Sequence, residues 1–213
     1  MKGLLIKDLR LMLMNKMTML FIVGLAVFFA IIGADEMAST YIMMLSPVCA
    51  MLAAGTVTYD DYDNGFGFLM TLPVTRKNYV IEKYIFIILA AVVGAILSVV
   101  VILVSGEKKE GFMYSIIMLF VMAVLYQMLY IPIIIKLGIE KAKIYSMILI
   151  GVFAGGLGYI AGGFIEDIVK YPVVAKLLTL DKGVVIALIG VVFFASVVIS
   201  IKVSTYFMNK KEF

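Results

Sequence analysis

The sequence predicts an all-α, polytopic membrane protein with a single transmembrane domain of six helices, and three observations support this fold class. Of the 213 residues, 64% are hydrophobic and only 15% are charged, whereas soluble domains average about 45–50% apolar residues. Six apolar stretches approach the roughly 20 residues that a helix needs to cross a bilayer, and none contains Asp, Glu, Lys, Arg or His. The stretches are continuous, whereas strands of a membrane β-barrel alternate. They are residues 17–33, 39–57, 84–104, 112–135, 144–164 and 183–201.

Residues 1–16 are predicted to form an interfacial helix ahead of the first apolar stretch. Leu5, Ile6 and Leu9 fall on one helical face, whereas Lys7 and Asp8 fall on the other. This division is typical of helices that lie along a membrane surface. No convincing small-residue cleavage pattern follows the basic start, so we expect the segment to be retained.

The distribution of Lys and Arg predicts that both termini are cytoplasmic. Six spans place the two ends on one side of the membrane. Thirteen of the 18 Lys and Arg residues lie in 1–16, 58–83, 136–143 and 202–213, and five lie in the opposite connections. Because cytoplasmic loops are enriched in Lys and Arg, the first group is expected to face the cytoplasm across the plasma membrane. The net charge of +4 then needs no nucleic-acid partner.

The longest polar interruption, residues 58–83, is predicted to be a folded cytoplasmic element. A ridge of aromatic and apolar residues recurs at steps of three and four, and acidic residues flank it. This pattern indicates a short amphipathic helix that continues from the second span, or two helices broken at Gly65 and Gly67. Thr75 is predicted to cap the helix that becomes the third span. The ridge comprises Tyr59, Tyr62, Phe66, Leu69 and Pro73, and the flank comprises Asp60, Asp61 and Asp63.

Two other interpretations of this stretch fail on spacing and charge. A calcium loop that starts at Asp61 requires Gly at its sixth position and Glu at its twelfth, but Phe66 and Leu72 stand there. A nucleic-acid surface requires an excess of basic charge, but the aspartates nearly balance the basic residues. Two interpretations stay open: a docking surface for a partner protein, and a helix packed on its own protein.

Small residues distinguish the fifth span, and mixed polarity distinguishes the segment after it. Gly residues, with Ala154, recur mainly at four-residue spacing, which lets a neighbouring helix of this chain or of a second protomer approach closely. Residues 165–182 mix apolar residues with charges and Pro172, which predicts short re-entrant helices on the outer side. The glycines predicted to pack are Gly151, Gly155, Gly158 and Gly162.

Missing residue types exclude several activities. The chain has no His, which removes His-based triads and the usual zinc sites. It has no Gly-Lys dipeptide, so a Walker A motif is absent. We therefore expect no catalytic, cofactor-binding or metal-binding residues here. Uncharged spans disfavour a proton-driven carrier.

Three segments, taken together, resemble the short six-span permease subunits of type-2 ABC transporters. The resemblance is to the bacterial kind found among exporters of bacteriocins, lantibiotics and amphipathic peptide toxins, and it covers nearly the whole chain in order. The segments are MKGLLIKDLRLM before span one, YDDYDNGFGFLMTLPVTRKNYVIEKYI after span two and IPIIIKLGIEKAK after span four.

The resemblance implies a half-transporter in which two permeases pair, alike or related. Each would carry a separate cytoplasmic ATP-binding subunit, which holds the ATP and Mg. Residues 59–71 are similar to the family's coupling helix, residues 1–16 to its elbow helix and residues 165–182 to its extracellular re-entrant helices. The expected contacts with the ATP-binding subunit are Tyr59, Asp60, Asp61, Tyr62, Asp63, Phe66, Leu69, Met70, Arg76 and Lys77, with Lys136, Glu140 and Lys141 in the second cytoplasmic loop.

The expected cargo is an amphipathic peptide or another lipophilic molecule, because the spans offer Met, Phe and Tyr but no charge. The remaining surface is expected to contact membrane lipid. Two alternative functions stay open: a channel or carrier that works without an ATPase, and a non-transporting membrane protein that gives immunity by sequestering peptide.

Overall fold

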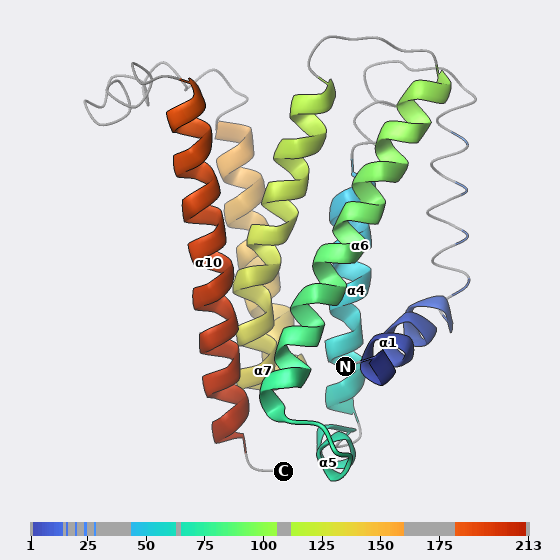
Figure 1. The fold of residues 1–213 in the computed structure, drawn as a ribbon, viewed down its shortest axis with the longest axis vertical. Helices are drawn as coiled ribbons and strands as arrows, with labels where there is room; N and C mark the ends of the chain where they lie inside the picture. Colours follow the sequence, from blue (N-terminus) through green and yellow to red (C-terminus); the bar gives the residue numbers. More distant parts are fainter. Residues whose placement is uncertain are drawn as a thin grey trace.

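The computed structural model describes residues 2–14, 44–62, 65–105, 112–159 and 182–211, together with residues 16, 20, 24 and 28. Every regular element in this part of the chain is a helix, which confirms the all-α prediction for it. Figure 1 shows long helices side by side, with α5 at one end of the bundle, called here the α5 end. The helices are α1 (Lys2–Met14), α4 (Leu45–Asp61), α5 (Gly65–Thr71), α6 (Arg76–Ser105), α7 (Phe112–Tyr159) and α10 (Lys182–Lys210).

Helices α4 and α6 pack closely because small residues meet where they cross. Ala50 and Ala53 of α4 are fully buried. A Cβ added at Gly94 of α6 would lie only 2.7 Å from the Leu45 carbonyl oxygen. The Ser46 hydroxyl donates a hydrogen bond of 3.0 Å to a carbonyl of α6. Small residues at such crossings let two backbones approach within the membrane.

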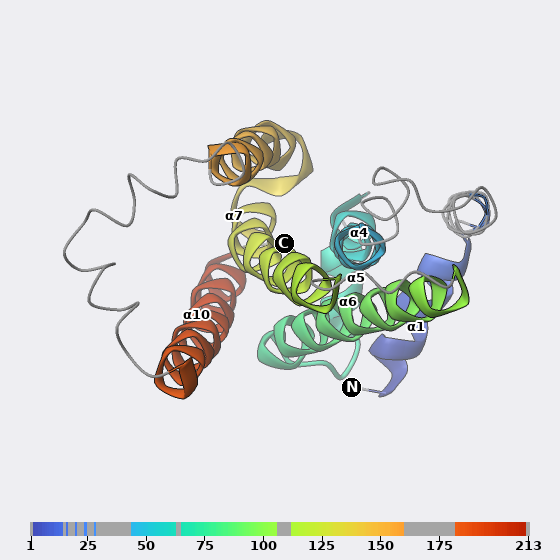
Figure 2. The same cartoon turned by 90° about the horizontal axis from the view of Figure 1, so that it is seen from above.

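Helix α7 consists of two helical arms joined by a sharp turn at Gly138. This residue has φ 74° and ψ 176°, a backbone conformation that Gly adopts far more readily than other residues. The two arms run back along each other (Figures 1 and 2). The helix stop predicted at Gly138 is confirmed, and the turn lies within the predicted 136–143 connection, whose other residues are helical. Lys136 belongs to the first arm, which reaches Leu137, and Glu140 and Lys141 belong to the second arm.

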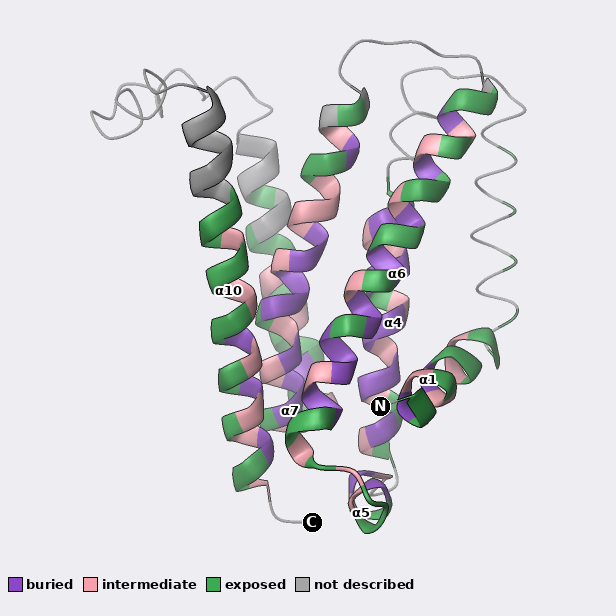
Figure 3. Ribbon diagram, viewed as in Figure 1, coloured by how far each residue is buried: buried purple, intermediate pink, exposed green. Residues whose placement is uncertain are grey.

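The remaining helices surround a core that is densest towards the α5 end. Helix α10 packs on α7 and α6, and α1 rests on α4 and α6. Tyr79, Ile131 and Met208 are fully buried where α6, α7 and α10 meet. The outer faces of the long helices instead expose large apolar side chains such as Val104 and Ile199, and Figure 3 shows exposed positions along these helices. Apolar residues on the outside are typical of helices whose solvent is lipid.

Three helical stretches of the described chain are long and apolar enough to cross a membrane: Arg76–Val104, Ser115–Val152 and Gly190–Lys210. The second stretch contains the Gly138 turn, so its two arms run in opposite directions. The predicted span 39–57 corresponds to α4, which is described from Leu45 onward. Nearly all of the predicted span 17–33 lies outside the described residues, as do 165–181, so the count of six spans remains a prediction.

The contact between α4 and α6 predicts that Gly94→Ala lowers thermal stability. The new methyl group would clash with the α4 backbone, and overpacking of this kind costs about 1–3 kcal/mol. Thermal unfolding of the purified protein in detergent measures the effect. The matched control is Gly55→Ala, because a Cβ at Gly55 meets nothing within 4 Å. Equal midpoints for the two variants would contradict the close contact.

Candidate functional site

Four charged residues from three helices form a buried ion cluster near the α5 end: Lys7 and Asp8 of α1, Asp60 of α4 and Lys83 of α6. The Asp60 carboxylate lies 2.5 Å from the Lys7 ammonium and 2.7 Å from the Lys83 ammonium. Lys83 also pairs with Asp8, and both residues have fully buried side chains. Lys7 lies 3.2 Å from Asp8. Each carboxylate therefore contacts both ammonium groups.

Two neutral side chains add hydrogen bonds to the ion cluster. The Tyr79 hydroxyl donates to Asp60 at 3.0 Å. The Thr56 hydroxyl lies 3.1 Å from Asp8 and accepts a hydrogen bond of 3.0 Å from Lys83. Buried charges are costly unless they are paired and hydrogen-bonded, and both conditions are met for Asp60 and Lys83.

Helix α1 packs on the bundle with both apolar and charged residues, and Leu5 and Met12 are partly buried against the same core as Leu4. Leu4 and Asp8 are buried, whereas Ile6, Leu9 and Leu13 are exposed. Although burial lowers the pKa of Lys7, the carboxylates of Asp60 and Asp8 raise it, and its pKa ends above the usual value. Residues 2–14 are helical, and Lys7 and Asp8 of this helix are paired inside the protein; its position at a membrane surface remains a prediction.

Glu82 adds a third carboxylate beside the ion cluster. Its side chain is buried, and neither carboxylate oxygen receives a hydrogen bond from the described part of the chain. The two aspartates and two lysines balance each other, so an ionised Glu82 would leave an excess negative charge. A buried acceptor without a donor costs free energy of folding. The stability of this side of α6 is therefore sensitive to the surrounding charges.

Helix α5 packs through Phe66 and Leu69 and presents Phe68 outward. Phe66 is 2% exposed and Leu69 is 6% exposed, whereas Phe68 is 71% exposed. The Phe66 ring meets the Tyr79 ring edge-on, with centroids 5.6 Å apart. The packed face of α5 therefore rests on the residue that also binds Asp60.

The predicted ridge does not form one face, because the helix is interrupted. Tyr62 has φ −69° and ψ 141°, an extended conformation that ends α4, and α5 begins anew at Gly65. The helical phase is therefore reset between Tyr62 and Phe66. Tyr59 and Tyr62 are exposed, whereas Phe66 and Leu69 are buried. Asp63 lies outside the described residues.

Asp61 ties the end of α4 to the Gly138 turn and to the end of the chain. One carboxylate oxygen accepts a hydrogen bond of 3.2 Å from the Ile139 backbone N–H, which is free at the start of the second arm. The other accepts one of 2.7 Å from the Lys211 ammonium. Lys211 also lies 4.3 Å from the centre of the Phe66 ring. Asp61 therefore binds its own chain rather than standing free.

Arg76 and Thr75 fix the start of α6. The Arg76 guanidinium donates hydrogen bonds of 3.1 and 2.6 Å to the Met208 and Asn209 carbonyls, which lie in the last turn of α10. A cation is favourable at a helix C-terminus. The Thr75 hydroxyl accepts a hydrogen bond of 3.2 Å from the Asn78 backbone N–H, which confirms the predicted N-cap.

The other residues predicted to contact a partner are exposed or partly exposed. Lys77, Lys136, Glu140 and Lys141 are exposed, and Met70 is half-buried.

A Cβ at Gly151 or Gly155 would meet nothing within 4 Å, so these two glycines pack on no helix of the described chain. The surroundings of Gly158 are not described, and Gly162 lies outside the described residues.

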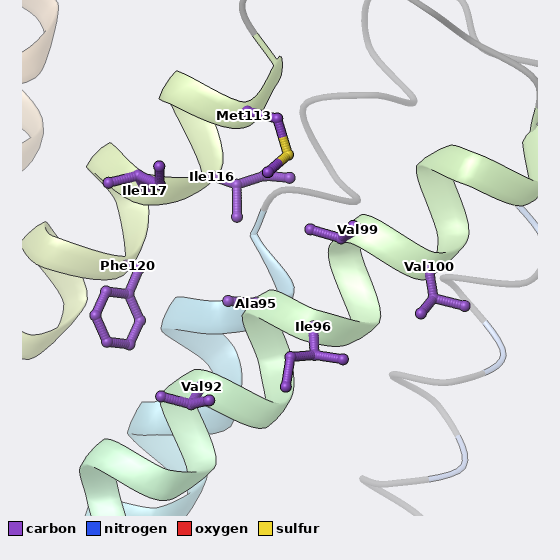
Figure 4. Close-up of a pocket in the computed structure, with 9 residues that line it drawn as sticks. All are labelled: Val92, Ala95, Ile96, Val99, Val100, Met113, Ile116, Ile117 and Phe120. Carbon is purple, nitrogen blue, oxygen red and sulfur yellow. The ribbon is translucent and has the colours of Figure 1, made fainter.

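An apolar cavity lies between α6 and the first arm of α7, far along the bundle from α5. Its volume is about 350 Å³. Figure 4 shows Ile96 and Val99 of α6 facing Ile116 and Phe120 of α7 across it. No charged side chain lines the cavity, so it can accept lipophilic groups.

Comparison with protein families identifies what this bundle is. Residues 3–209 match the family described as ABC-2 family transporter protein. The chain belongs to the ABC-2 transporter family. It is therefore a membrane component of a transporter, not the catalytic component, and the family implies an ATP-binding partner. Searches of curated proteins and of solved structures gave no match.

The ion cluster predicts that Lys83→Met strongly destabilises this ABC-2 protein. The change leaves two buried aspartates facing Lys7 alone, and breaking a buried ion pair costs about 3–5 kcal/mol. Thermal unfolding in detergent measures the loss. Lys77→Met is the matched control because Lys77 is exposed, and surface substitutions usually change stability by less than about 0.5 kcal/mol.

A second variant separates charge balance from lost packing. Adding Asp8→Asn to Lys83→Met removes one negative charge, so the double variant should be more stable than the sum of the two single losses predicts. The ion cluster would be unimportant if Lys83→Met and Lys77→Met unfolded at the same temperature.

Substitutions of the two phenylalanines of α5 are predicted to differ strongly in their effect on stability. Phe66→Ala opens a buried site, and substitutions of this kind cost about 3–5 kcal/mol. Phe68→Ala removes an exposed ring and should change the unfolding midpoint little. The same thermal measurement tests both variants, and a larger loss for Phe68→Ala would contradict the packing of α5.

Proposed function

We propose that this chain is the permease subunit of an ABC exporter and that the outer face of α5 docks onto the cytoplasmic ATP-binding subunit. One observation carries the proposal. Helix α5 is firmly packed on one side but exposes Phe68 by 71% on the other, and Leu72, which directly follows the helix, is exposed by 42%. A short helix with an exposed apolar face is suited to insertion into a groove on a partner protein.

The contacts of α5 supply a route from the docking face to the membrane helices. Phe66 packs on Tyr79, which binds Asp60, and Asp60 holds both α1 and α6 through lysines. Asp61 reaches the Gly138 turn, and Arg76 reaches the end of α10. We propose that closure of two ATP-binding subunits displaces α5 and that these contacts carry the displacement to all five neighbouring helices.

This route changes the roles that we propose for the residues predicted to contact the ATP-binding subunit. Asp60, Asp61 and Arg76 transmit the motion inside the chain, and Phe66 and Leu69 anchor α5. Phe68, Leu72, Tyr59 and Tyr62 are the residues that reach the ATP-binding subunit, with Lys77 and the exposed charges after Gly138 at the rim. Rim charges of this kind orient a partner more than they strengthen binding.

The proposed assembly contains two six-span permeases with their termini in the cytoplasm. Two observations support this arrangement. Helix α1 and the last turn of α10 lie towards the α5 end (Figure 1). The glycines at positions 151 and 155 meet no helix of the described chain, which leaves room for close approach by a second permease.

The proposed cargo is an amphipathic peptide or another lipophilic molecule. The uncharged cavity between α6 and α7 supports this substrate class, because it could take apolar side chains or tails but offers no partner for a charge. The charged groups of the described core gather instead at the ion cluster, near the α5 end.

Phe68→Asp is predicted to abolish association with the ATP-binding subunit while leaving the permease folded. A charge placed in an apolar interface is costly, and the exposed position of Phe68 spares the fold. The measurement is co-purification of the ATP-binding subunit with the permease and stimulation of its ATP hydrolysis. Leu72→Asp should act in the same direction with a smaller effect.

Asn78→Asp is the matched control, because it adds the same charge to an exposed position at the same end of the molecule. It should retain the partner. Full co-purification and full ATP hydrolysis with both Phe68→Asp and Leu72→Asp would show that α5 is not the coupling element.

A further inference from the structure

A second cavity, between the first arm of α7 and the end of α10, combines basic and aromatic side chains. Its volume is about 350 Å³, and its lining has both polar and apolar surface. It lies at the α5 end of these two helical segments, where charged residues follow the apolar stretches. The lining residues are Ile135, Lys136, Tyr206, Phe207, Lys210 and Lys211.

Two lysines of this cavity carry charges that no carboxylate of the described chain neutralises. The Lys136 ammonium lies 4.8 Å from the centre of the Phe207 ring, and the Lys210 ammonium lies 4.7 Å from that of Tyr206. Both lysines are exposed. Lys211 differs, because Asp61 already binds it. Since an ammonium has three donors, Lys136 and Lys210 can each hold an anionic oxygen while resting on a ring.

An exposed apolar stripe on α10 leads to the same cavity. Val192, Ile199, Val203 and Tyr206 recur at helical spacing and are exposed by 66%, 61%, 37% and 54% respectively. The stripe ends at Lys210, one turn beyond Tyr206. Lys202, also exposed, lies one turn before Tyr206 on that side. This side of α10 is therefore apolar as far as Ile199 and gains the basic residues Lys202 and Lys210 beyond it, as a phospholipid changes from acyl chain to phosphate.

We propose that this cavity binds the headgroup phosphate of an anionic phospholipid, with Lys136 and Lys210 as ligands and the α10 stripe against its acyl chain. Basic pockets between membrane helices are suited to anionic headgroups. A free phosphate would use the lysines but not the stripe. A carboxylate of a docked protein would need no apolar path from the bilayer. The apolar-to-basic continuity on α10 therefore favours the lipid.

A single-tryptophan reporter tests the site, because the chain contains no Trp. The full chain carrying Tyr206→Trp is reconstituted in bilayers of phosphatidylcholine with increasing brominated phosphatidylglycerol, and quenching of the indole gives the relative lipid affinity. Brominated phosphatidylcholine provides the reference. An indole also supports a cation above its ring, so the substitution keeps the site.

The expected result is stronger quenching by phosphatidylglycerol than by phosphatidylcholine. Lys136→Gln and Lys210→Gln should each lower this preference about fivefold, the equivalent of about 1 kcal/mol per basic residue near an anionic surface. The controls Lys2→Gln and Lys16→Gln each remove one positive charge from an exposed position, as each pocket variant does, and should leave the preference unchanged.

Four outcomes would overturn the proposal. Equal quenching by the two lipids would show that the site does not select charge. A preference that survives loss of both pocket lysines would place the anionic lipid elsewhere. Displacement of the lipid by millimolar inorganic phosphate would make a free phosphate the ligand. Quenching by neither lipid would show that another protein surface covers this face of α10.

Discussion

The carboxylate of Asp60 is the constraint on which the α5 end of this ABC-2 protein depends. It lies between the ammonium groups of Lys7 and Lys83, so α1, α4 and α6 can each occupy only the position that keeps these charges together. A buried charge without its partner costs several kcal/mol, and small displacements are therefore opposed. The pairing restricts geometry more than it adds stability, because desolvation offsets much of the attraction.

The packing of α5 follows from this constraint. Tyr79 binds Asp60 through its hydroxyl and supports Phe66 with its ring, so one side chain connects the charges to the helix that we propose as the docking element. Asp61 and Arg76 extend the rigid region to the Gly138 turn and the end of α10. The apolar cavity between α6 and α7 lies beyond this region, and the side chains that line it are all apolar (Figure 4).

Local signals predicted the local features. Thr75 caps α6 and Gly138 breaks α7 because each acts within a few residues of itself. The orientation of α5 was not predictable by counting from Tyr59, since the extended Tyr62 resets the helical phase. The pairing of Asp8 was missed because its partner, Lys83, follows 75 positions later. Lys83, directly before the predicted span 84–104, was the available signal, but the sequence does not indicate which carboxylate it pairs with.

That separation along the chain also orders the assembly of the protein during synthesis. Helix α1 leaves the ribosome before α4 and α6, so Lys7 and Asp8 have only each other as partners until α4 brings Asp60 and α6 brings Lys83. Until then α1 can rest at the bilayer surface with its charges in water. The surface on which α1 packs exists only after α4 and α6 are inserted. The burial of Asp8 is therefore expected to follow membrane insertion rather than to accompany it.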